Sequence, residues 1–208
     1  MTYLAENWDF VLELAWQHIS LAASVLFIAL ALALPLGVLL ARFGRLATPV
    51  LGLLSVVYTI PSMALFALLI PVTGLGFKTA ATALVVYSQF ILVRNTVAGL
   101  QGVDPAVLEA AVGMGMSGWQ VFREVRLPLA MPVILAGVRV AAVSIIGLAS
   151  LAAWINAGGL GVLLFQGLYQ DHATKIWTGT ILIAFIAIAA SRLLQRLERR
   201  IRSGLDGP

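Results

Sequence analysis

The chain has 208 residues, of which 61% are apolar and only 11% are charged, and its mean hydropathy is +1.02. These values exclude an ordinary soluble domain and indicate an integral membrane protein. The sequence contains no cysteine, which excludes disulfides, cysteine zinc sites and thiol nucleophiles, and its net charge of +4 is informative mainly through the positions of the basic residues.

The first predicted element is a short amphipathic helix lying on the membrane surface. Apolar residues recur along it at helical spacing, at Leu4, Trp8, Leu12, Ala15 and Ile19. We expect Trp8 and Trp16 to lie at the level of the lipid headgroups.

Five stretches are long and apolar enough to cross a bilayer, which requires about 20 residues. They are residues 18–41, 50–70, 77–98, 129–152 and 174–194. Residues 153–171 are interrupted by the sequence NAGGLG, and we interpret them as an irregular or re-entrant connection and not as a sixth span. The predicted fold is therefore an all-α membrane protein in which residues 1–208 form one domain with five transmembrane helices.

Polar residues within the second and third spans are candidates for lining a translocation path. The candidates are Tyr58, Pro61, Ser62, Tyr87, Gln89 and Asn95. A proline inside a span frees a carbonyl that must find a partner, which favours a packed or water-lined position. The alternative for the sequence YTIPSM is a kinked helix whose hydroxyl groups bond to their own backbone.

The connection between the third and fourth spans, residues 104–128, is predicted to form two short helices joined by a glycine corner. Asp104 can cap the first helix and Pro105 suits its first position. Ser117 and Gln120 have the spacing of a capping box at the start of the second helix. The sequence Leu127-Pro128 is expected to end that helix before the fourth span.

Gly113, Gly115 and Gly118 in this connection match the spacing G-x-G-x-x-G. A dinucleotide-binding turn needs a strand before the first glycine, whereas a helix is predicted there. No P-loop sequence occurs in the chain, so ATP hydrolysis by that route is excluded, and we expect the chain not to be an enzyme. A DNA-reading helix pair is disfavoured because no basic patch surrounds the second helix, and no nucleic-acid partner is expected.

Arg139 lies inside the fourth span and is expected to face the bundle, where it holds backbone carbonyls or the side chains of Gln89 and Asn95. We expect it to be structural and not to bind substrate. His18 and His172 are each expected at a membrane interface and not on a metal, and no cofactor is expected.

The basic residues predict the orientation in the membrane. With five spans, ten of the thirteen Lys and Arg residues fall on one side, which the positive-inside rule assigns to the cytoplasm. The N-terminus is then outside, and the C-terminus and the 104–128 connection are inside.

The sequence from Glu109 to Pro128 resembles the E-A-A-x3-G-x9-I-x-L-P loop of binding-protein-dependent ABC transporter permeases of bacteria and archaea. The match departs from that pattern only at Val125, where the family has isoleucine. The sequences RNTVAGLQGVDPAVLEAAVGMGM, LPLAMPVILAGVRVAAV and INAGGLGVLLFQGL look like the branch of the family that imports osmoprotectants such as glycine betaine, carnitine and choline. The resemblance covers about residues 18–200.

The resemblance implies the transmembrane domain of a type I importer in the bacterial or archaeal cell membrane. It implies cytoplasmic ATPase subunits, a second permease subunit, an external substrate-binding protein and membrane lipid as partners. The residues that would couple to the ATPase are Glu109, Ala110, Ala111, Gly113, Gly115, Leu127 and Pro128, and the candidates for an outer gate are Asn156, Gly158, Gly159 and Gly161. The alternative is a secondary transporter driven by an ion gradient, but no acidic residue lies within a predicted span.

Overall fold

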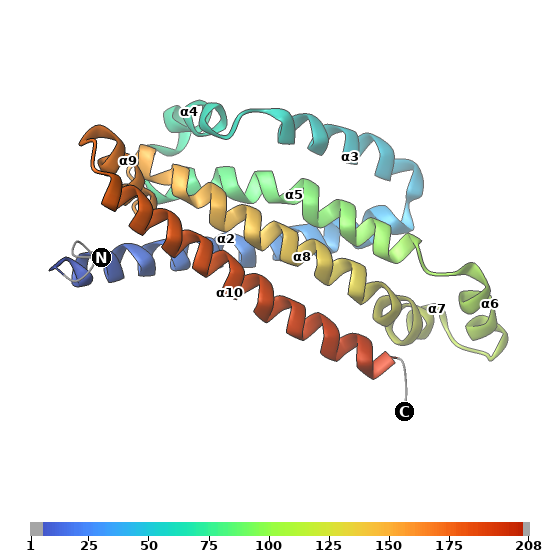
Figure 1. Ribbon diagram of the computed structural model, residues 1–208. Helices are drawn as coiled ribbons and strands as arrows, with labels where there is room; N and C mark the ends of the chain where they lie inside the picture. Colours follow the sequence, from blue (N-terminus) through green and yellow to red (C-terminus); the bar gives the residue numbers. More distant parts are fainter. Residues whose placement is uncertain (1–5, 206–208) are drawn as a thin grey trace.

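The computed structural model describes residues 6–205, and within that range the chain is helical with no strand. Four helices are long and apolar enough to cross a membrane: α2 (Trp8–Arg42), α5 (Phe77–Gln101), the helical run Gly118–Ile155, and α10 (Ala173–Leu205). In α10 the part long and apolar enough is Ala173–Arg200. Figure 1 shows the four helices running side by side; α5 packs against both α2 and α8 (Leu127–Ala149), and α10 packs against α8. Of the four, α5 is the most buried and α10 the least.

The predicted surface helix at the N-terminus is wrong as a separate element, because α2 is a single helix of 35 residues. No glycine or proline interrupts the sequence from Trp8 to Leu34, so nothing separates an initial helix from the first span. Its length of about 52 Å exceeds the thickness of the hydrocarbon core. Val11 and Leu14 pack against Leu160 and Leu163, which fixes the first turns of the helix to the bundle. Leu4 lies outside the described residues.

The second predicted span is two helices, α3 (Gly44–Thr59) and α4 (Ser62–Thr73), which meet at an angle of 96°. Ile60 has an extended backbone, with φ −64° and ψ 128°, as expected for a residue that precedes proline. Pro61 has no N–H to continue the α3 hydrogen-bond ladder. Pro61 therefore predicts where the helix is distorted. The structure has a break between two helices at this position, and not the kinked helix that was one of the two interpretations of the sequence.

The fourth and fifth predicted spans coincide with α8 and with the first two thirds of α10. The region between them contains the 3-10 helix η2 (Ser150–Ile155), a loop and the nine-residue helix α9 (Gly161–Tyr169). At about 14 Å, α9 is too short to cross a bilayer. The prediction of an irregular connection in place of a sixth span is confirmed.

The 104–128 connection contains α6 (Pro105–Gly113), α7 (Gly118–Gln120) and the π-helix η1 (Val121–Arg126). Leu127-Pro128 does not end the second helix, because α7, η1 and α8 follow one another without a break. In η1 the Leu127 N–H donates to the Phe122 carbonyl, five residues earlier. This wider turn accommodates Pro128, whose ring would clash with the carbonyl four residues earlier in an ordinary α-helix.

Candidate functional site

Residues 104–128, which we call the hairpin, project beyond the end of the bundle at which α2 ends and α3 begins (Figure 1). The predicted caps are present. The Asp104 carboxylate accepts a hydrogen bond of 2.9 Å from the Ala106 N–H, and Pro105 occupies the first turn of α6. At the second helix, the Ser117 N–H donates to Gln120 Oε1 at 2.8 Å, and the Gln120 N–H donates to Ser117 Oγ at 3.4 Å. Each helix of the hairpin therefore starts at a residue fixed by its own side chain.

The corner of the hairpin depends on one glycine. Gly115 has φ +87°, a conformation that costs an L-residue roughly 1–2 kcal/mol. Gly113 is the last residue of α6, and a Cβ added there or at Gly118 would meet no atom within 4 Å. Of the glycines in the predicted glycine corner, the backbone therefore requires glycine only at Gly115.

The hairpin exposes Glu109, Ala110 and Gly113, whereas Ala111 is 2% exposed. Of the two alanines predicted to couple to the ATPase, Ala110 is therefore exposed to a partner, whereas Ala111 is covered by the hairpin itself. Leu127 and Pro128 are half-buried at the base of the hairpin.

Large apolar side chains are exposed near the corner of the hairpin. Val112 is 60% exposed and Met114 is 77% exposed. They lie beside the exposed carboxylate Glu109 on a segment that projects away from the membrane-crossing helices. An exposed apolar patch with a charged rim is typical of a protein-binding surface.

Two of the predicted path residues meet in the membrane-crossing part of the fold. Tyr58 of α3 and Tyr87 of α5 are in edge-to-face contact with ring centroids 5.7 Å apart, and the Tyr58 ring is 5.2 Å from that of Phe90. We call these three residues the aromatic cluster. Ser88 and Ser144 line a crevice of about 10 Å³ beside the two tyrosines, which is room for at most about one water molecule.

Gln89 and Asn95 lie elsewhere and hold helices together. Gln89 Nε2 donates to the carbonyls of Ala29, at 3.3 Å, and Val85, at 3.2 Å, and so ties α5 to α2. Asn95 Nδ2 donates to the Ile91 carbonyl at 2.7 Å. The Asn95 side chain packs so closely on Gly137 of α8 that a Cβ at Gly137 would collide with it.

Pro61 and Ser62 lie at the α3–α4 break, three and four residues along the chain from Tyr58. Sequence reasoning missed Phe90 and Ser144. Ser144 is the only hydroxyl residue of α8, a signal that could have identified it.

Arg139 pairs with Glu198 of α10, with Nε 3.8 Å from Oε2. The predicted contacts with Gln89 and Asn95 are wrong, because both amides donate to backbone carbonyls. Glu198 lies beyond the predicted fifth span, residues 174–194, but α10 continues through it and brings it beside α8. The side chains are 31% and 22% exposed, so the pair is partly solvated, which reduces its energetic contribution.

The loop of residues 156–161, which we call the glycine loop, lies at the end of the bundle opposite to the hairpin (Figure 1). Asn156 has φ 62°, Gly158 has φ 75° and Gly159 has φ 80°. The Gly159 N–H donates to Gln17 Oε1 of α2 at 3.0 Å, and the Ile155 carbonyl accepts from the Gly76 N–H at 2.7 Å. A side chain at Gly161 would collide with the Ser150 carbonyl. The loop is thus attached to α2 through Gly159, and the residue before the loop, Ile155, is attached to the residue before α5.

His18 is completely buried, and its Nε2 lies 3.0 Å from the Ile146 carbonyl of α8. Its side chain is therefore covered by the bundle, and its place at a membrane interface stays a prediction. No group of three or more His, Cys, Asp or Glu side chains that could hold a metal ion occurs among residues 6–205.

Comparison with known proteins identifies the family. The family described as "Binding-protein-dependent transport system inner membrane component" matches residues 33–203. The chain belongs to this permease family. The permease is similar over almost its full length to the osmoprotectant import permease protein OsmW of Salmonella typhimurium, with 41% identity over 94% of each chain. It is 38% identical to the carnitine transport permease protein OpuCB of Listeria monocytogenes, over 97% of this chain and 92% of that protein.

The fold of the permease is also that of solved transporters. It matches a chain of the inward-facing MetNI methionine ABC transporter with a TM-score of 0.83 and 22% identity, over 94% of this chain and 98% of that one. A chain of an amino acid ABC transporter with histidines matches with a TM-score of 0.71 and 20% identity, over 96% of this chain and 97% of that one. The permease is therefore a multi-pass inner membrane subunit of an ABC importer with the type I importer fold.

Proposed function

We propose that this permease forms the translocation path of an ATP-driven importer for a small quaternary-ammonium osmoprotectant such as glycine betaine, choline or carnitine. The observation that carries the proposal is the 38–41% identity, over almost the whole chain, to a carnitine and an osmoprotectant permease. The permease works with two cytoplasmic ATPase subunits, an external substrate-binding protein and a second permease subunit, which is the same chain or a close relative.

The aromatic cluster supports this substrate class. A quaternary ammonium group cannot donate hydrogen bonds, and proteins bind it through the faces of aromatic rings. Tyr58 is 39% exposed beside the α3–α4 break, whereas Tyr87 is 7% exposed. The crevice of about 10 Å³ between them is too small for an osmoprotectant, so passage requires α3 to move away from α5 and expose ring faces.

Coupling to ATP hydrolysis is assigned to the hairpin. Its exposed Glu109, Ala110, Val112 and Met114 offer a compact surface to the ATPase, and its second helix continues into α8. Closure of the two ATPase subunits would move the hairpin and shift the permease between outward-open and inward-open states. In this proposal the hairpin and the C-terminus lie in the cytoplasm, and the glycine loop lies at the outer mouth.

An uptake assay tests the proposal. Vesicles that contain the permease, its ATPase and its binding protein are supplied with labelled glycine betaine, choline and carnitine. ATP-dependent accumulation of at least one, insensitive to collapse of the ion gradients, is the expected result. Accumulation that requires an ion gradient and not ATP would refute the proposal, and transport of none of the three would refute the substrate class.

A further inference from the structure

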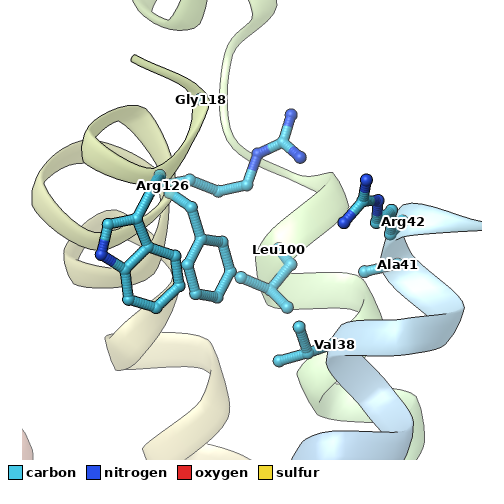
Figure 2. Close-up of a pocket in the computed structure, with 8 residues that line it drawn as sticks. Val38, Ala41, Arg42, Leu100, Gly118 and Arg126 are labelled. Atoms are coloured by element: carbon cyan, nitrogen blue, oxygen red, sulfur yellow. The ribbon is translucent and has the colours of Figure 1, made fainter. Parts of the chain in front are cut away.

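A cavity of about 510 Å³ lies where the hairpin joins the membrane-crossing helices. Its lining comes from the last turns of α2 and α5 and from the second helix of the hairpin: Val38, Ala41, Arg42, Leu100, Gly118, Trp119, Phe122 and Arg126. We call it the arginine pocket. Figure 2 shows the guanidinium groups of Arg42 and Arg126 on the same side of it, with the apolar side chains of Val38 and Leu100 below them.

The two arginines of the pocket carry charge that the described part of the chain does not neutralise. Among the described residues, neither guanidinium has a carboxylate within 4.0 Å. The Nε of Arg126 is buried without a hydrogen-bond partner. Leaving a buried donor of a charged group unsatisfied is costly, and an anion at Arg126 would satisfy it. Arg42 is exposed, with its guanidinium carbon 5.8 Å from the centroid of the Phe43 ring, so its charge is available to the same anion.

The rest of the pocket indicates what kind of anion fits. Below the two cations lie Val38 and Leu100, and one wall is made by Trp119 and Phe122, whose rings stack at 5.7 Å with an interplanar angle of 28°. A free inorganic phosphate would lose hydration against this apolar surface without compensation. An amphiphile with a negative head and an apolar body matches both parts.

The pocket also lies at the ends of two of the membrane-crossing helices. Arg42 is the last residue of α2, and Leu100 is the last but one of α5, so the pocket is where apolar spans give way to the polar hairpin. Trp119 is 66% exposed there, as is typical of tryptophan at the headgroup level. Basic pockets between membrane helices bind the headgroups of anionic lipids.

We propose that the arginine pocket binds the phosphate headgroup of an anionic phospholipid. The guanidinium groups contact the phosphate, and the upper part of an acyl chain packs on Val38, Leu100 and the aromatic wall. Because Arg42 belongs to the first span and Arg126 to the hairpin, the lipid links the hairpin to the bundle. The assignment to the inner leaflet rests on the proposed function; the binding itself does not.

The test is lipid binding to the purified full-length permease, measured by native mass spectrometry with phosphatidylglycerol and with phosphatidylcholine of the same acyl chains. The unmodified permease is expected to retain one phosphatidylglycerol per chain in preference to phosphatidylcholine. Arg42→Gln and Arg126→Gln are each expected to weaken phosphatidylglycerol binding about fivefold, since one arginine near the surface of an anionic membrane contributes about that factor.

Arg45→Gln is the matched control, because Arg45 is an exposed arginine at the start of α3 that does not line the pocket. It is expected to leave lipid binding unchanged. Arg126→Lys keeps the positive charge and is expected to keep most of the lipid binding. If it does, the weaker binding of Arg126→Gln is due to the lost charge and not to a disturbed fold. No ATP or osmoprotectant is present, so a failure of the proposed transport function does not affect this result.

Three outcomes would overturn the proposal. In the first, the two pocket variants and Arg45→Gln bind phosphatidylglycerol equally. In the second, millimolar inorganic phosphate displaces the lipid completely, which would make the pocket a site for a free anion. In the third, the assembled complex with the ATPase excludes the lipid from the pocket, which would make the two arginines part of the protein contact.

Discussion

Gly115 is the residue on which the shape of the hairpin depends most directly, and its replacement tests the proposed coupling. Its φ is +87°, and no atom lies within 4 Å of an added Cβ. Gly115→Ala therefore introduces backbone strain without a steric clash. That strain amounts to roughly 1–2 kcal/mol. If it is relieved by opening the corner, the ratio of native to opened hairpins falls about five- to thirtyfold.

The expected consequence is a loss of up to the same factor in the affinity of the ATPase subunit for the permease, because only the native hairpin presents the docking surface. Gly115→Asn is expected to lie between alanine and the native glycine, since asparagine adopts left-handed conformations more readily. The affinity is measured by titrating purified ATPase onto permease held in lipid nanodiscs, and ATP-dependent uptake is measured in parallel.

Gly113→Ala is the matched control. Gly113 is helical and has space for a methyl group, so alanine there is expected to be neutral or to stabilise the permease by up to about 1 kcal/mol. Equal affinities for Gly115→Ala and the unmodified permease would refute the reasoning. So would a loss in Gly113→Ala as large as that in Gly115→Ala.

Three further predictions concern the membrane-crossing part. Tyr58→Leu is expected to raise the half-saturating osmoprotectant concentration of transport about fivefold, and Tyr58→Phe to leave it unchanged, because the ring face makes the contact; equal effects in uptake assays would contradict this. The Arg139–Glu198 pair should contribute below about 1 kcal/mol in a double-mutant cycle of unfolding free energies, and a larger coupling would show that the pair is not solvated. Gln17→Leu removes the hydrogen bond to Gly159 and should cost about 1 kcal/mol while accelerating hydrogen exchange in residues 156–161; unchanged exchange would be the contrary result.

Local signals in the sequence predicted much of the fold. The caps at Asp104 and Ser117 depend on side chains that bond within three residues, and the distortion at Pro61 follows from proline chemistry, so a pattern of a few residues is sufficient for each. The first, third, fourth and fifth spans were located because continuous apolar sequence is what the bilayer requires.

The sequence could not predict the surroundings of residues whose neighbours in space come from other parts of the fold. The partner of Arg139 is 59 positions away and could be inferred only if α10 was known to extend past Glu198. The sequence around His18 does not show that α8 and the glycine loop cover its side chain. Likewise, Ala110 and Ala111 are indistinguishable in a motif, whereas the helix turns one outward and the other inward.

The unbroken helix from Gly118 to Ile155 has a mechanical consequence. Its 38 residues correspond to about 57 Å at the rise of an α-helix. Its first turns belong to the hairpin, and its other end leads into the glycine loop. A tilt of about 5° at the hairpin would displace the far tip by about 5 Å over that length. Such a displacement is enough to pull the Ile155 carbonyl away from Gly76. If this run moves as one body, movement of the hairpin would reach the glycine loop through a single continuous element, without a relay of side chains between them.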